Sequence, residues 1–109
     1  IHRISAQEFA TKFSEDSKII DVRKESEYDA EHVDNAYRRP LADINDWANA
    51  LNNDEHFFIH CAGGYRSMIA ASILNSRGIR NFTEIEGGFN KIKETSVPKS
   101  NFVCQSKTL

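Results

Sequence analysis

The chain has 109 residues and a formal net charge of −2, and its acidic and basic residues are interspersed. This length suits one domain with a single core, so we predict one domain over residues 1–109, with a core at about 4–93 and an extended tail at 94–109. The charge pattern offers no basic stripe for nucleic acid and no polybasic membrane anchor, and no apolar run approaches bilayer-spanning length. Two cysteines are too few for a disulfide-stapled secreted scaffold, which favours free thiols in a cytoplasmic setting.

The first half of the chain carries signals for a helix, a strand and a helical turn. Ser5 is followed three residues later by Glu8, the capping-box spacing that starts a helix, here running to about Phe13. A brief apolar strand at 18–22, one helical turn at 25–28 and a mostly extended stretch at 32–39 come next. An amphipathic helix is then predicted from apolar residues at helical spacing, namely Leu41, Ile44, Trp47, Ala48 and Leu51.

The second half alternates strand and helix signals. The apolar run at 57–59 predicts a buried strand, which leads through a glycine-rich loop into a helix from Ser67 to Arg77 that Gly78 ends. For the buried face of that helix we expect Met68, Ile69, Ala71, Ile73 and Leu74. A strand at 81–85, a Gly87-Gly88 turn and a short helix through Ile92 follow. This alternation predicts an α/β fold with a mainly parallel sheet and helices on both faces.

The strand at 57–59 leads directly to a cysteine, Cys61, at the carboxyl end where ligands bind in parallel sheets. The residues that follow it are Ala62, Gly63, Gly64, Tyr65, Arg66 and Ser67. Loop amides and a helix N-terminus that point at one spot favour an anion there, so Cys61 is expected to ionise more readily than a free thiol and to act as a nucleophile. The alternative is a buried structural cysteine beside an ordinary glycine turn. No second cysteine or histidine stands nearby at zinc-ligand spacing, which argues against a metal site.

Three groups of residues together resemble the rhodanese-like sulfurtransferases. They are Ile20-Asp21-Val22-Arg23 with Glu27-Tyr28, then His32-Val33 with Ala36 and Pro40-Leu41, then the run from Cys61 to Ser67 with Glu86-Gly87-Gly88-Phe89. The matches span about residues 4–92, nearly the whole chain. The resemblance implies a three-layer domain around a mainly parallel five-stranded sheet, with no cofactor and no metal.

The length of the loop separates two activities within this resemblance. Four residues stand between Cys61 and Arg66, as in rhodanese-like sulfurtransferases, whereas related phosphatases have one residue more because their loop wraps a tetrahedral phosphate. The resemblance therefore implies an enzyme that moves a sulfane sulfur from thiosulfate or a persulfide donor to a thiol or cyanide acceptor, through a persulfide on Cys61. A non-catalytic module or a sulfur relay within a larger protein stays open. The loop and the segment 97–104 also resemble the rhodanese module that follows a metallo-β-lactamase-fold domain in persulfide dioxygenases, so a covalently linked domain of that kind is a candidate partner.

The resemblance assigns roles to the residues of the loop. Cys61 and Arg66 are expected to be catalytic, and the substrate- or anion-binding loop is expected to comprise Ala62, Gly63, Gly64, Tyr65 and Ser67. Arg66 either clamps an anionic donor or holds the loop through a salt bridge. Ser67 is expected to be the N-cap of the following helix, and Tyr65 lies either at the rim of the site or in solvent.

Residues outside the loop are expected to be structural. Asp21, Arg23 and Glu27 form a charge cluster in this interpretation, in which Arg23 pairs with Glu27. His32 holds a turn by hydrogen bonds rather than acting as a base, since a thiolate that is already formed needs none. Cys104 either resolves the Cys61 persulfide as a disulfide or packs under the tail.

Overall fold

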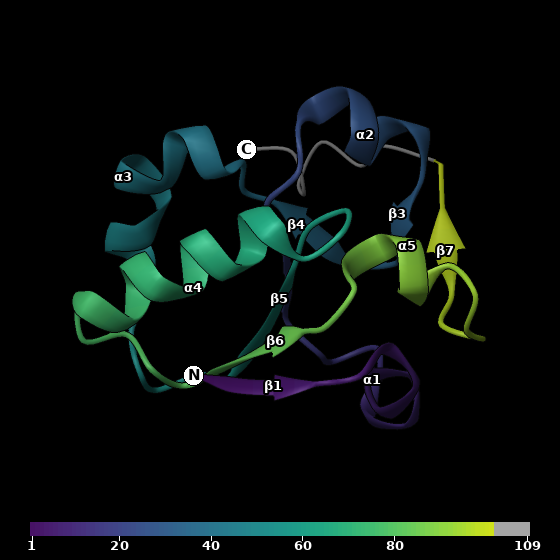
Figure 1. The fold of residues 1–109 in the computed structure, drawn as a ribbon, viewed down its shortest axis with the longest axis horizontal. Helices are drawn as coiled ribbons and strands as arrows, with labels where there is room; N and C mark the ends of the chain where they lie inside the picture. Colours follow the sequence, from purple (N-terminus) through teal and green to yellow (C-terminus); the bar gives the residue numbers. More distant parts are fainter. Residues whose placement is uncertain (102–109) are drawn as a thin grey trace.

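A five-stranded parallel sheet forms the centre of the computed structural model, which describes residues 1–101 (Figure 1). Its strands are β1 (His2–Ile4), β2 (Ile19–Asp21), β4 (Ala36–Arg38), β5 (Phe57–His60) and β6 (Phe82–Ile85). They lie in the order β1-β6-β5-β2-β4, and all neighbouring pairs are parallel. The predicted α/β architecture is therefore confirmed, with β5 in the middle of the sheet. A separate antiparallel pair joins β3 (His32–Val33) to β7 (Lys99–Ser100).

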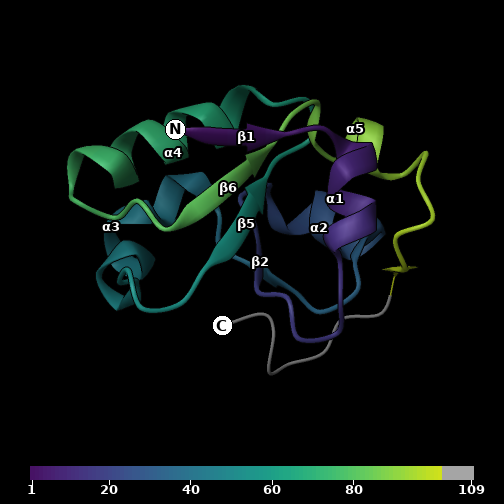
Figure 2. The same ribbon diagram turned by 90° about the horizontal axis from the view of Figure 1, so that it is seen from below.

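Helices cover both faces of the sheet. They are α1 (Ala6–Lys12), α2 (Glu25–Ala30), α3 (Ile44–Trp47), α4 (Tyr65–Ser76) and α5 (Gly88–Ile92). In Figure 2, α3 and α4 lie to one side, and α1, α2 and α5 gather on the other. Alternate side chains of β5 enter the two cores: Phe58 packs with Phe9 in one, and Ile59 packs with Leu74 in the other. Each core fixes one helical layer against the sheet.

Two predicted helices differ from the observed ones. The segment 41–51 is a short α3 between the 3₁₀ turns Leu41–Asp43 and Ala48–Ala50, and it is not one continuous helix. Helix α4 begins at Tyr65 with the left-handed Gly64 as its N-cap, so the prediction of Ser67 as N-cap is wrong. Met68 and Ile69 are each 37% exposed, and the fully buried positions are Ser67, Ala70, Ala71 and Leu74. The burial of Ala71 and Leu74 was predicted, but Ser67 and Ala70 are small residues, which a search for large apolar side chains misses.

Both ends of the described chain add structure that the sequence did not predict. Strand β1 pairs with β6 at one edge of the sheet, although its three residues are too few to show an alternation of apolar and polar positions. At the other end, Val97 is buried in the core and β7 pairs with β3. Cys104 lies outside the described residues. Within residues 1–101, no helix has the length and apolar character needed to cross a bilayer.

Candidate active site

Cys61 follows β5 directly and lies at the carboxyl edge of the sheet, with β2 and β6 on either side. Its side chain is buried, with 1% of its surface exposed. The amide of Gly64 donates a hydrogen bond to the Cys61 Sγ at 3.0 Å, and the thiol lies 3.4 Å from the Ser67 hydroxyl. Gly64 has φ +107°, a conformation that side-chain-bearing residues rarely adopt, and this turns its N–H back toward the sulfur.

Helix α5 holds the start of the loop by its backbone. The amides of Phe89 and Asn90 donate to the carbonyl oxygens of Cys61 and Ala62 at 2.7 and 2.9 Å. This close approach depends on Gly88, because a Cβ there would lie 2.7 Å from the Ala62 carbonyl oxygen. In Figure 1 the loop after β5 runs beside α5 and beneath α2, so two helices distant in sequence fix its shape.

Arg66 forms a two-pronged ion pair with Glu27 of α2, at 2.7 and 2.9 Å. The hydrogen bond to Arg66 lowers the pKa of Glu27 to about 2, and the same bond raises the pKa of Arg66. The predicted Arg23–Glu27 pair is therefore wrong, because Glu27 faces the loop. The pair ties α2 to the first turn of α4, and it orients the guanidinium at the edge of the site.

Arg23 pairs with Asp21 instead. Both are buried at the end of β2, where the Arg23 guanidinium donates to both carboxylate oxygens at 2.8–3.1 Å and to the Glu31 carbonyl at 2.7 Å. It also lies over the Phe89 ring, 4.4 Å from the centroid. This cluster braces α5 and the turn after α2, and neither side chain hydrogen-bonds to the Cys61 sulfur in the described part of the chain. His32 is buried in the same turn, with Nδ1 2.7 Å from the Tyr28 carbonyl and its ring stacked on Tyr28.

His60 lies behind the loop on the face opposite the Cys61 side chain. It is fully buried, stacks on Phe89, and has Nδ1 3.0 Å from the Cys61 carbonyl oxygen. Burial lowers its pKa, so the ring is neutral at physiological pH. Its Nε2 has no hydrogen-bond partner among the described residues and lies 3.8 Å from Asp21 Oδ2.

Two site residues were missed at the sequence level, Glu84 and Arg3. Glu84 is a buried carboxylate on β6 that accepts a hydrogen bond from the Ser67 hydroxyl at 2.6 Å and pairs with Arg3 of β1 at 2.7 Å. A charged residue inside the otherwise uncharged and fully buried strand 82–85 was the available signal. Arg3 gave no signal, because its strand was not predicted.

The outer surface of the loop is apolar at its helical end. Tyr65 is 79% exposed, so its ring stands in solvent and does not line the sulfur site. Met68 and Ile69 follow on the same exposed side of α4. Within residues 1–101, no three His, Cys, Asp or Glu side chains come together as a metal-binding group.

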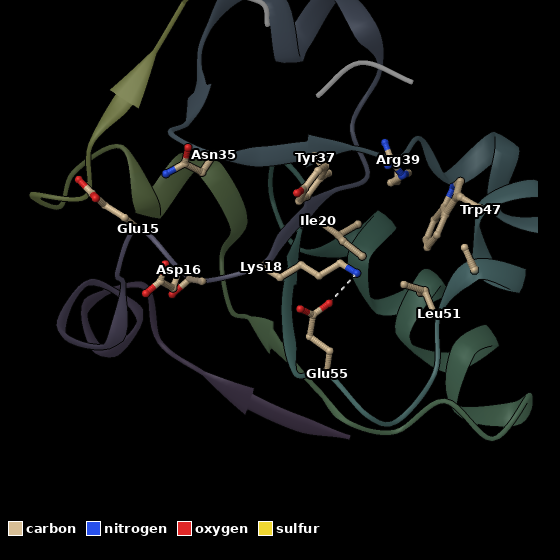
Figure 3. Close-up of a pocket in the computed structure, with 12 residues that line it drawn as sticks. Glu15, Asp16, Lys18, Ile20, Asn35, Tyr37, Arg39, Trp47, Leu51 and Glu55 are labelled. Atoms are coloured by element: carbon tan, nitrogen blue, oxygen red, sulfur yellow. Dashed lines mark hydrogen bonds and ion pairs between the residues drawn. The ribbon is translucent and has the colours of Figure 1, made fainter. Parts of the chain in front are cut away.

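A pocket of about 360 Å³ lies elsewhere, beside β4 and α3. Figure 3 shows its lining, in which Lys18 pairs with Glu55 at 3.1 Å below Tyr37 and Trp47. It contains no residue of the loop 61–67. The Cys61 site, where the Gly64 amide donates to the sulfur, is therefore separate from this pocket.

Comparison with known proteins identifies the family of this fold and loop. The family model of the rhodanese-like domain matches residues 5–95. The chain belongs to the rhodanese-like domain family. The crystal structure of a rhodanese-related protein from Thermoplasma volcanium superposes with a TM-score of 0.83, covering 94% of this chain and 100% of that one at 24% identity.

Two curated relatives match this chain at somewhat higher sequence identity than that structure. The putative sulfur carrier protein YrkF of Bacillus subtilis is 31% identical over 90 residues, which are 81% of this chain and 49% of that protein. The chain thus spans about half the length of that relative. The thiosulfate sulfurtransferase GlpE of Coxiella burnetii is 27% identical over 93 residues, covering 85% of each chain.

Proposed function

We propose that this chain is a sulfurtransferase that moves a sulfane sulfur from thiosulfate or a persulfide donor to a thiophilic acceptor through a persulfide on Cys61. One observation carries the proposal: the Cys61 sulfur receives the Gly64 amide at 3.0 Å, at the base of a loop whose Arg66 is oriented by Glu27. A thiol aligned with a backbone donor at a strand end and a helix start is suited to nucleophilic attack. The name of the GlpE relative supports the same chemistry.

The proposed reaction has two displacement steps. The Cys61 thiolate attacks the outer sulfur of the donor, the donor's sulfur–sulfur bond breaks, and its electron pair leaves with sulfite or a thiolate. A thiolate or cyanide then attacks the terminal sulfur of the Cys61 persulfide, which breaks the new bond and returns Cys61 as a thiolate. The Gly64 amide stabilises the anionic sulfur in both steps, and no electrons are gained or lost overall.

A sulfur relay is a second candidate. The YrkF relative is named a putative sulfur carrier, and this chain matches about half of it. The acceptor would then be a thiol of a linked or partner domain, such as a metallo-β-lactamase-fold domain, in the cytoplasm. Transfer to a small thiol in solution would be slow in that case.

Mass spectrometry of the intact protein tests the proposal. After incubation with thiosulfate or glutathione persulfide, the wild-type protein should gain the mass of one sulfur atom, and a thiol acceptor should remove it. Cys61→Ser should fold and gain nothing, while Cys104→Ser serves as the matched control and should still load. Sulfur gain by Cys61→Ser at the wild-type rate would contradict the assignment. Hydrolysis of an aryl phosphate, without sulfur loading, would support a phosphatase instead.

A further inference from the structure

The Ser67 hydroxyl lies between the candidate nucleophile and a buried carboxylate. Its oxygen is 2.6 Å from Glu84 Oε2, 3.4 Å from Cys61 Sγ and 3.3 Å from the Gly64 carbonyl oxygen. A hydroxyl has one proton to donate, and a bond to a carboxylate is the strongest of these. The Ser67 proton therefore points to Glu84, which leaves a lone pair of the serine oxygen facing the sulfur.

Arg3 keeps Glu84 in its charged form. The Arg3 Nε donates to the other carboxylate oxygen at 2.7 Å, and Arg3 is the direct cross-strand neighbour of Glu84 in the β1–β6 register. Only 1% of Glu84 is exposed, and a buried carboxylate persists as an anion where it is paired in this way. The other charged groups around the loop have partners of their own, since Arg66 pairs with Glu27 and Arg23 with Asp21, and His60 is neutral.

We propose that Glu84 is a positioning residue that restrains formation of the Cys61 thiolate by holding the Ser67 proton away from the sulfur. The neutral thiol can donate its own proton to the Ser67 oxygen, which stabilises the resting form. A thiolate would face the serine lone pair, and it could receive the Ser67 proton only if the short bond to Glu84 broke. Glu84 and the Cys61 thiolate thus compete for one proton. This inference rests on the proposed role of Cys61 as nucleophile.

Alkylation of Cys61 as a function of pH tests this proposal without any sulfur donor. Iodoacetamide reacts with the thiolate, and peptide mapping follows Cys61 separately from Cys104. Glu84→Gln keeps the shape of the side chain and removes its charge, so Ser67 is free to donate to the sulfur. Below the pH of half-maximal alkylation, this variant should react roughly 3- to 10-fold faster than wild type, the range expected for one hydrogen bond. Glu86→Gln, an exposed carboxylate on the same segment, is the matched control and should match wild type.

Two further variants separate this role from a structural one. Arg3→Gln removes the charge whose pairing keeps the buried Glu84 an anion, so its hold on the Ser67 proton weakens and alkylation should become faster at the same pH, in the same direction as Glu84→Gln. In Ser67→Ala/Glu84→Gln the serine donor is missing, and most of the gain seen in Glu84→Gln should disappear.

Several outcomes would overturn the proposal. Glu84→Gln reacting at the wild-type rate would leave Glu84 with a purely structural role, and a slower reaction would make it a proton acceptor for the thiol. If the faster alkylation persists in Ser67→Ala/Glu84→Gln, the negative charge of Glu84 alone, and not the Ser67 hydrogen bond, would control the reactivity of Cys61. If Glu84→Gln fails to fold, Arg3→Gln at its half-exposed position tests the same point, and an unchanged or slower reaction of that variant would refute the proposal. Since no donor is involved, these results stand whether or not sulfur loading is observed.

Discussion

At the scale of single residues, the Glu27–Arg66 ion pair fixes the position of the Arg66 guanidinium beside the loop that carries Cys61. Both side chains are about one-third exposed, so solvent screens the pair and its contribution to stability is modest. The pair matters mainly for orientation, because its two hydrogen bonds fix the plane of the Arg66 guanidinium. Lysine at position 66 would keep the charge and lose that planar fork.

The pH dependence of stability should report this pair. Arg66 lowers the pKa of Glu27 from 4.5 to about 2, so the pair's contribution is complete above pH 4.5 and is lost as the pH falls through about 2. Glu27→Gln should therefore lower the free energy of unfolding at neutral pH, and its difference from wild type should shrink between pH 4.5 and 2. Urea denaturation across this range measures the effect. Glu25→Gln, exposed on the same helix, is the control, and an equal shrinkage in that variant would show that Glu27 is not responsible.

At the scale of elements, α5 holds the loop that carries Cys61 in place through two amides and the absence of a side chain at Gly88. Gly88 has φ +57° and Gly78 has φ +86°, but a Cβ at Gly78 meets nothing within 4 Å, whereas at Gly88 it meets the loop carbonyls. Alanine at either position takes on a backbone strain of about 1–2 kcal/mol. Of the two positions, only Gly88 would also bring the added methyl group into collision with the carbonyl groups of the loop.

Gly88→Ala should thus destabilise the protein by about 1–3 kcal/mol more than Gly78→Ala does, the range typical of overpacking. It should also slow sulfur loading of Cys61, since the loop must shift to make room. Denaturation midpoints and loading rates of both variants measure this. If Gly78→Ala slows sulfur loading as much as Gly88→Ala does, general destabilisation explains the slower loading, and the contact between α5 and the loop does not.

At the scale of the whole molecule, the sequence predicted elements formed by neighbouring residues, and it missed ion pairs between residues that are far apart in the chain. The strand, loop and helix around Cys61 follow from residues that are adjacent in the chain, and the sheet follows from their alternation. The Arg3–Glu84 pair joins residues 81 positions apart, and it exists because β1 lies beside β6 in the strand order. The pairing of Glu27 with Arg66, 39 positions away, depends in the same way on how α2 packs over the loop. On α4, the burial of Ala71 and Leu74 was predicted correctly, whereas Ser67 and Ala70 were missed because they are small, and Met68 and Ile69 were wrongly placed inside.

The distribution of charge over the molecule bears on the choice of donor. The chain has a net charge of −2, Arg66 is neutralised by Glu27, and the residue after Cys61 is the uncharged Ala62. Behind Ser67, the buried Glu84 is likewise paired with Arg3, so the pair adds no unpaired positive charge for an anionic donor. Beside these groups, the exposed side chains of Tyr65, Met68 and Ile69 form an apolar rim. This arrangement opposes a compact dianion more than a larger donor whose charges are spread over an organic skeleton.

Glutathione persulfide should therefore load Cys61 faster than thiosulfate, and Ala62→Arg should shift the ratio of the two rates toward thiosulfate. One added charge near the sulfur, in a partly screened position, should change that ratio by roughly 3- to 10-fold, and by less at high salt because exposed charges are then screened. Second-order loading rates for both donors on one preparation measure the ratio, and Ala62→Gln controls for side-chain size. Faster loading by thiosulfate in the wild-type protein would sink the prediction. An unchanged ratio in Ala62→Arg would show that the missing charge does not set the preference, and the apolar rim of Tyr65 and Met68 would then be the next feature to change.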